Sequence, residues 1–232
     1  MLACKALAAL LLYPDEKLIA ALPEIGAILR ESGLPPSERD AVLRFCNQLG
    51  ASELMQAQGE YVALFDAAPS LSLYLFGHVH GDRRDRGQAM ADLVEDYRRV
   101  GLEPAGDELP DFLPLFLEYT SLHPPEQSRA LLGEIAEIVA LLAGRLQKRG
   151  TAYAAVLRAI EALAGRRADR QAVDARIEQD EPTDTPEALD AQYEEAPVTF
   201  MEPAADSECA KAASLVAQFS RDLPPRSRQP NR

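Results

Sequence analysis

Cysteine is scarce in this chain of 232 residues, which contains only three. Cys4, Cys46 and Cys209 are widely separated and match neither a disulfide framework nor the paired C-x-x-C spacing of a zinc site. We therefore interpret all three as free thiols in a reducing cytosol.

Histidine is equally scarce, and its placement argues against a metal centre. His78 and His80 lie two residues apart, so their rings would diverge on a helix, and His123 is the only other histidine. Two ligands do not make a site. The sequence thus predicts no bound metal and disfavours a small hydrolase or metal enzyme.

Long apolar runs and export signals are also lacking. The longest strongly apolar run, around residues 135–143, is shorter than the roughly 18 to 20 residues that span a bilayer. The first residues, MLACKALAALLLYPDEK, contain an internal Lys but no basic n-region followed by a small-residue cleavage site. We expect a cytoplasmic protein without direct membrane insertion.

An excess of basic residues is absent, because the formal net charge is -13. Most of the acidity lies in residues 171–209, which carry twelve Asp or Glu and one Arg. The last stretch, 210–232, is instead basic, and residues 1–170 are only mildly acidic. Such a chain would repel nucleic-acid phosphates, so we expect neutral or basic partners and no nucleic acid.

Runs of alternating β-branched residues are missing, whereas helical periodicity recurs throughout the first 170 residues. We predict an all-α, single-domain helical bundle over 1–170. Residues 171–232 are predicted to be an acidic, largely disordered tail, with one candidate amphipathic helix at 210–223. The expected helices cover 2–12, 15–31, 37–49, 52–66, 70–77, 83–100, 109–121, 126–149 and 151–165.

Some of these helices have recognisable ends. Ser37 and Ser52 are candidate N-caps, because a hydroxyl oxygen can accept from the free amides of a first turn. Gly101 can close the helix at 83–100 in the left-handed conformation. Pro23 is expected to kink or split its helix.

The segment ELPDFLPLFLEY, residues 108–119, has an apolar stripe at helical spacing. On a continuous helix, Glu108, Asp111, Leu115 and Glu118 would share the opposite face. One reading is that the carboxylates merely favour the positive end of their own helix. The other is an acidic, partly apolar surface for a basic amphipathic peptide, since no nucleophile or oxyanion donor accompanies the carboxylates.

Aromatic and leucine side chains crowd the segment YVALFDAAPSLSLYLF, residues 61–76. A run that is apolar on every side is either fully buried or lines a groove. Tyr61 and Tyr74 are the members expected to present an edge to a ligand, because their hydroxyls need a polar partner.

The order of four segments carries a family resemblance: YVALFD, SLSLYLFGHVHGDRRDRGQAM, DLVEDYRRVGLE and ELPDFLPLFLEY. Over about residues 1–165 the chain resembles the NarJ group of redox-enzyme maturation chaperones. These proteins assemble respiratory membrane-bound nitrate reductase and are more distantly related to the TorD and DmsD chaperones. The two central motifs and their spacing make the resemblance specific.

The resemblance implies an all-helical domain without enzymatic activity. Such a chaperone would bind the N-terminal, twin-arginine-like segment of the apo catalytic (alpha) subunit of membrane-bound nitrate reductase. It would keep that subunit competent for insertion of molybdenum cofactor and iron-sulfur clusters, holding no cofactor stably itself. The alternative is a helical adaptor or regulatory scaffold that binds a folded protein.

The resemblance also indicates functional positions. Glu108, Asp111, Leu113 and Glu118 match the second motif of the family, whereas Phe112 stands where the family has a histidine after the aspartate. Together with the aromatic segment, these positions give the expected peptide-binding set: Tyr61, Phe65, Leu73, Tyr74, Phe76, Glu108, Asp111, Leu113, Leu115 and Glu118.

Overall fold

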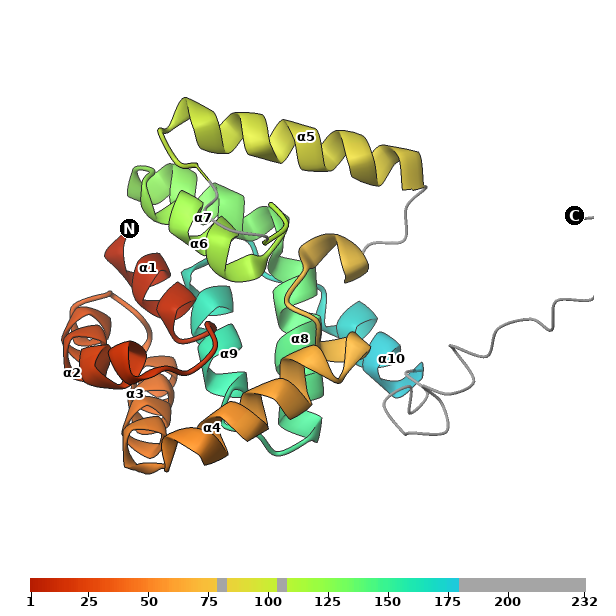
Figure 1. Ribbon diagram of the computed structural model, residues 1–232. Coiled ribbons are helices and arrows are strands. Elements are labelled where there is room, and N and C mark those ends of the chain that lie inside the picture. The colour runs from red at the N-terminus through yellow and green to blue at the C-terminus, as the bar shows by residue number, and fades with distance from the viewer. Residues whose placement is uncertain (79–82, 104–107, 180–232) are drawn as a thin grey trace, which may run out of the picture. The chain divides into compact units, whose positions relative to one another are not determined.

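Ten α-helices, with short π and 3-10 turns between some of them, make up the part of the chain that the structure describes (Figure 1). The structure is a computed structural model and describes residues 1–78, 83–103 and 108–179. The α-helices are α1 (Leu2–Ala9), α2 (Glu16–Arg30), α3 (Pro36–Ala51), α4 (Leu54–Tyr61), α5 (Arg83–Arg99), α6 (Leu113–Ser121), α7 (Pro125–Glu134), α8 (Ala136–Lys148), α9 (Ala154–Leu163) and α10 (Arg170–Gln179). The all-α prediction is confirmed.

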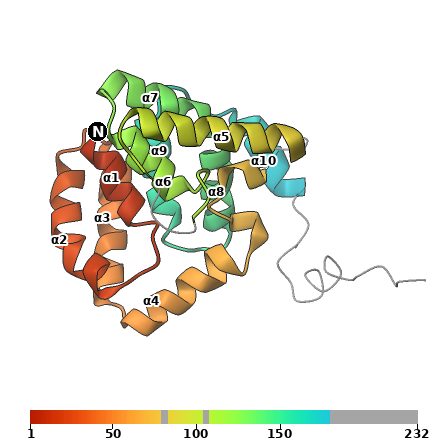
Figure 2. The same cartoon turned by 45° about the horizontal axis from the view of Figure 1, so that its top comes forward.

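Helix α9 lies at the centre of the packing and contacts α1, α3, α7 and α8, as the two views show together (Figures 1 and 2). It is buried almost all round, with Leu157 and Val156 fully covered. Each such aliphatic side chain contributes about 1.5 to 3 kcal/mol through removal from water. Helix α1 packs in turn between α6 and α2.

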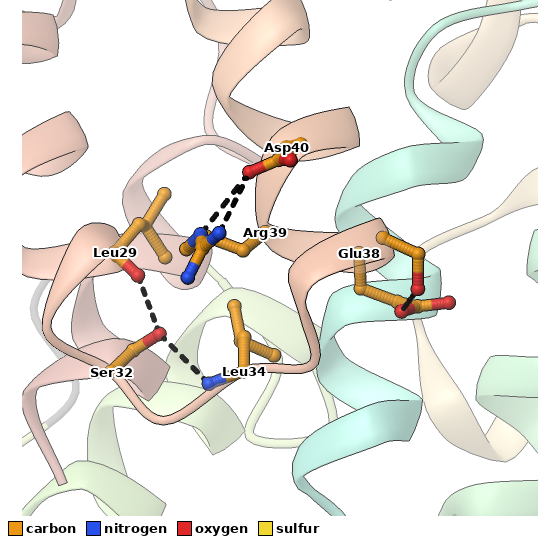
Figure 3. A network of polar contacts seen from close by, with 7 residues as sticks. Leu29, Ser32, Leu34, Glu38, Arg39 and Asp40 are labelled. Carbon is orange, nitrogen blue, oxygen red and sulfur yellow. Dashed lines mark hydrogen bonds and ion pairs between the residues drawn. The ribbon is translucent and has the colours of Figure 1, made fainter.

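The turn from α2 to α3 is fixed by its own polar contacts (Figure 3). The Ser32 hydroxyl donates to the Leu29 carbonyl at 2.6 Å and accepts from the Leu34 amide at 3.4 Å. Gly33 between them has φ +73°, which a side chain would strain. Ser37, expected as an N-cap, instead donates to the neighbouring Glu38 carboxylate, and α3 begins one residue earlier.

Helix α4 continues into a π-helical turn, η1 (Val62–Asp66), in which the Ala67 amide reaches the Val62 carbonyl at 2.9 Å. The expected helix at 52–66 is therefore present but changes its winding near its end. Ser52 does not start it, since this residue caps the end of α3.

Two expected helices have different boundaries. The helix predicted at 70–77 is wrong: short 3-10 turns occupy Pro69–Leu71 and Leu75–His78, and residues 72–74 between them are not helical. The helix predicted at 109–121 begins only at Leu113. Neither segment is α-helical here, because residues 73–76 form backbone hydrogen bonds with residues 111–113 instead.

Other expectations meet mixed outcomes. The long helix predicted at 126–149 is broken at Ile135 into α7 and α8. Pro23 does not split α2, which runs continuously past it. Gly101 closes α5 with φ +76°, as predicted.

Helix α10 extends the helical part of the chain beyond residue 170, where the tail was expected to begin. It packs on α8, where Ile177 lies over Gly144 so closely that an added Cβ would meet its terminal carbon at 2.3 Å. The predicted helix at 210–223 lies outside the described residues.

Candidate functional site

A groove runs across the end of α1, the turn after it, the π turn η1 and the start of α6. It has two adjoining halves that share Leu12, Glu108 and Phe112. The half we call the aromatic half encloses about 550 Å³, and the α1–α6 half encloses about 230 Å³. Such a continuous trough has the dimensions for an extended or helical segment rather than a single small molecule.

The aromatic half takes its name from five rings, and three carboxylates accompany them. The rings belong to Tyr13, Tyr61, Phe65, Tyr74 and Phe112. The carboxylates belong to Asp15, Asp66 and Glu108.

Tyr61 and Phe65 form the floor of this half. Their rings contact each other at 5.0 Å and both lean on Tyr153 of the α8–α9 connection, at 6.3 and 5.1 Å between centroids. The buried Tyr61 hydroxyl donates to the Leu11 carbonyl at 2.9 Å. Tyr61 therefore has its polar partner within the protein and offers only its ring to the groove.

The wall opposite is held by the pairing of residues 73–76 with residues 111–113. The Leu75 amide donates to the Asp111 carbonyl at 2.9 Å, and the Leu113 amide donates to the Leu73 carbonyl at 2.8 Å. The Asp111 carboxylate adds a third link, because its Oδ2 accepts from the Phe76 amide at 3.0 Å. Asp111 has no exposed surface.

Glu108 and Tyr74 form the rim above this wall. The Tyr74 hydroxyl donates to Glu108 Oε2 at 2.6 Å, which raises the pKa of Tyr74 to about 12 because the bond favours the protonated phenol. The Tyr74 ring also packs on Phe112 at 5.4 Å. The rim thus keeps an exposed carboxylate beside two aromatic faces.

In the α1–α6 half the walls are small and apolar, formed by Ala8 and Ala9 of α1 against Pro114 and Leu115 of α6. Glu118 lies at its edge, with Oε1 3.8 Å from the Lys5 Nζ.

Seven of the ten expected peptide-binding residues line the groove: Tyr61, Phe65, Leu73, Tyr74, Glu108, Leu115 and Glu118. Phe76 is half-buried against the core beside it. Asp111 and Leu113 are fully buried beneath it. The shared helical face expected for Glu108, Asp111 and Glu118 does not form, because α6 begins after the first two.

In the aromatic half, sequence reasoning missed five residues: Leu12, Tyr13, Asp15, Asp66 and Phe112. In the α1–α6 half it also missed Lys5, Ala8, Ala9 and Pro114. Leu12 and Tyr13, in the turn after α1, are 46% and 49% exposed, whereas Leu10 and Leu11 just before them are fully buried. The sequence did carry a signal for Leu12 and Tyr13. In LLLYPDE the apolar run continues up to Pro14, and in the structure α1 already ends at Ala9.

Within the described residues, no group of three His, Cys, Asp or Glu side chains is arranged to hold a metal ion. No helix in that same part of the chain is long and apolar enough to cross a membrane. His78 is buried, and its Nε2 lies 2.7 Å from the Ser72 carbonyl, an acceptor that requires the ring nitrogen to donate. His80 lies outside the described residues.

Burial lowers the pKa of His78, and Arg145 and Arg176 lower it further. The hydrogen bond to Ser72 and the carboxylate of Asp111 act in the opposite direction without reversing the shift. The native protein therefore binds fewer protons here than the unfolded chain does once the pH falls below the ordinary histidine pKa of about 6.5.

We expect the contribution of neutral His78 to the free energy of unfolding to be full above about pH 6.5 and to fall as the pH is lowered. Thermal unfolding at pH 7 and pH 5.5 measures this dependence. His78→Gln, which keeps a donor for Ser72, should show a shallower dependence than the parent. Equal slopes in the two proteins would contradict the assignment.

Comparison with known proteins places these features in a family. The model of the nitrate reductase delta subunit family matches residues 31–159. NarW of Escherichia coli strain K12, named a probable nitrate reductase molybdenum cofactor assembly chaperone, is 39% identical over 94% of this chain and 90% of its own length.

Two further relatives carry related names. The nitrate reductase molybdenum cofactor assembly chaperone NarJ of Escherichia coli strain K12 is 40% identical over 90% of this chain and 88% of its own. The probable NarJ of Bacillus subtilis strain 168 is 33% identical over 75% of this chain and 94% of its own. These relatives are assembly chaperones, in agreement with the expectation that the chain is not an enzyme. This chain therefore belongs to the nitrate reductase delta subunit family, in its group of NarJ-type molybdenum cofactor assembly chaperones.

Proposed function

We propose that this protein is a cytoplasmic chaperone of nitrate reductase assembly and that the groove holds the N-terminal, leader-like segment of the apo catalytic subunit. In this role it keeps the subunit competent to receive molybdenum cofactor and iron-sulfur clusters. The observation that carries the proposal is the groove itself, an aromatic trough rimmed by carboxylates on a chain of this family.

A basic amphipathic segment matches this groove in two ways. Its apolar side would cover Leu12 and Tyr13, which water now contacts, and its Arg or Lys side chains would face the carboxylates. Ordering a flexible peptide costs free energy, so the buried apolar area must supply most of the affinity. The exposed charges mainly set specificity and the dependence on salt.

The double variant Leu12→Ala, Tyr13→Ala is expected to weaken binding of the client's N-terminal peptide by about 10- to 30-fold, because it removes two exposed apolar contacts at the centre of the groove. Calorimetric titration of the full chain with the synthetic peptide measures the change. Neither side chain is buried, so the fold should be retained. Circular dichroism and the melting temperature check that it is.

Met55→Ala provides the matched control. Met55 is an apolar residue of α4 that is 82% exposed and does not line the groove, so its loss should leave the affinity unchanged. The assignment of the groove would be contradicted if both variants weakened binding equally. It would also be contradicted if neither variant weakened binding.

Co-purification separates the proposal from the alternative of an adaptor for a folded protein. The chaperone should capture the apo catalytic subunit, lose it when the N-terminal segment is deleted, and fail to capture the finished holoenzyme. Capture of the holoenzyme alone would instead support the adaptor.

A further inference from the structure

The two halves of the groove differ in their charge balance. In the α1–α6 half, Glu118 already has a counter-ion, since Lys5 Nζ lies 3.8 Å from its Oε1. The rest of that half is apolar, apart from Glu108 at the boundary with the aromatic half. A cationic ligand side chain placed beside Glu118 would therefore compete with Lys5 and would also be repelled by it.

The aromatic half has the opposite balance. Asp15, Asp66 and Glu108 contribute three carboxylates, and among the described residues that line this half there is no Lys or Arg. The partner of Glu108 there is the neutral hydroxyl of Tyr74, which leaves the negative charge uncompensated. The Asp15 carboxylate likewise accepts from a neutral donor, the Leu18 amide, at 2.7 Å.

The rings add a second attraction for cations in the same place. The faces of tyrosine and phenylalanine rings attract guanidinium and ammonium groups within about 6 Å, and the effect adds to that of nearby carboxylates. Tyr13 is half-exposed and Tyr74 partly so, and both line the hollow that contains the three carboxylates. Rings and carboxylates therefore favour the same class of side chain.

Building on the proposed function, we infer that the groove has a polarity: the cationic side chains of the bound segment lie in the aromatic half, and its apolar helical part lies in the α1–α6 half. Lys5 disfavours the reverse placement. The residues that recognise cations are then Asp66 and Glu108, with Asp15 beside them. Glu118 serves to balance Lys5, and Asp111 is buried out of reach.

A double-mutant cycle between protein and peptide tests this polarity. The probe is a synthetic amphipathic peptide with two adjacent arginines at one end and leucines at helical spacing, together with its Arg→Gln version. Both peptides are titrated calorimetrically into the full chain and into its Asp66→Asn and Glu118→Gln variants. The side chains of Asp66 and Glu118 are both accessible to solvent, and each substitution removes one negative charge.

We expect the Arg→Gln change to weaken binding to the parent protein roughly three- to fivefold more than binding to Asp66→Asn, the scale of one exposed ion pair. Glu118→Gln should show no such coupling. Coupling at Glu118 that equals or exceeds coupling at Asp66 would overturn the polarity. So would a failure of the probe to bind at all.

The same titration separates this inference from the proposed function. If the client's own N-terminal peptide does not bind while the probe couples to Asp66, the proposed client is wrong and the polarity stands. If the client peptide binds but its arginines couple to Glu118, the function stands and the polarity is wrong.

Discussion

Tyr153→Ala is expected to lower the free energy of unfolding by about 3 to 5 kcal/mol, the usual cost of emptying a buried aromatic site. Tyr153 is almost fully buried, and its ring contacts Phe45, Tyr61 and Phe65 at 4.7, 6.3 and 5.1 Å between centroids. Two of these partners form the floor of the groove. Denaturant unfolding measures the loss, and peptide affinity should fall with it.

Tyr153→Phe separates the ring from its hydroxyl. The hydroxyl oxygen is buried and has no hydrogen-bond partner in the described part of the chain. Removing an unsatisfied buried group should raise the free energy of unfolding by about 0.5 to 1.5 kcal/mol while the ring contacts remain. If Tyr153→Phe were as destabilising as Tyr153→Ala, the hydroxyl would have a partner that matters, and the packing explanation would fail.

Asp111→Ala is expected to cost about 2 to 4 kcal/mol, because it leaves the Phe76 amide without its acceptor and opens space under the groove. The carboxylate joins two segments that are far apart in the sequence, so its loss should also loosen the Glu108–Tyr74 rim. We expect weaker peptide binding even at temperatures where the variant is fully folded. Chemical denaturation and calorimetry give the two quantities.

The control is Asp111→Asn, whose amide oxygen can still accept from Phe76. It should stay within about 1 kcal/mol of the parent in stability and keep most of the affinity, because the charge of Asp111 never meets the ligand. Arg86 Nη2 lies 4.0 Å from Asp111 Oδ2, so the charge does have a local counter-ion. Loss of binding in a stable Asp111→Asn protein would mean that the charge itself recognises the client.

The helical spacing of apolar residues predicted the core helices well, because each of these helices buries one side along its whole length. Helix α9 and the end of α5 follow from apolar spacing and from Gly101, both local signals. The stretch 108–112 has the same apolar spacing as α6 but is not helical. The Asp111 carbonyl instead accepts from the Leu75 amide, and the Leu113 amide just after the stretch donates to the Leu73 carbonyl. A pairing between segments more than thirty positions apart leaves no local trace in the sequence.

The same limit applies to the groove. The aromatic segment and the acidic motif were recognised as candidates, and most of their residues do line the groove. The contribution of the turn after α1 was missed because it depends on where Leu12 and Tyr13 point once α1 ends. The pairing of Lys5 with Glu118, which gives the groove its polarity, joins α1 to α6 and is equally invisible to spacing arguments.

The π turn at the end of α4 has a consequence for how the groove opens. A π turn closes its hydrogen bonds over five residues instead of four, and it is rarer and less favourable than an α turn. Phe65 and Asp66, which line the groove, are both in this turn. Local opening tends to begin at such weak turns, so amide hydrogen exchange here can be faster than in the rest of α4. Because Phe65 is buried against Tyr61 and Tyr153, fraying of this turn would move Asp66 and would also loosen the aromatic floor of the groove.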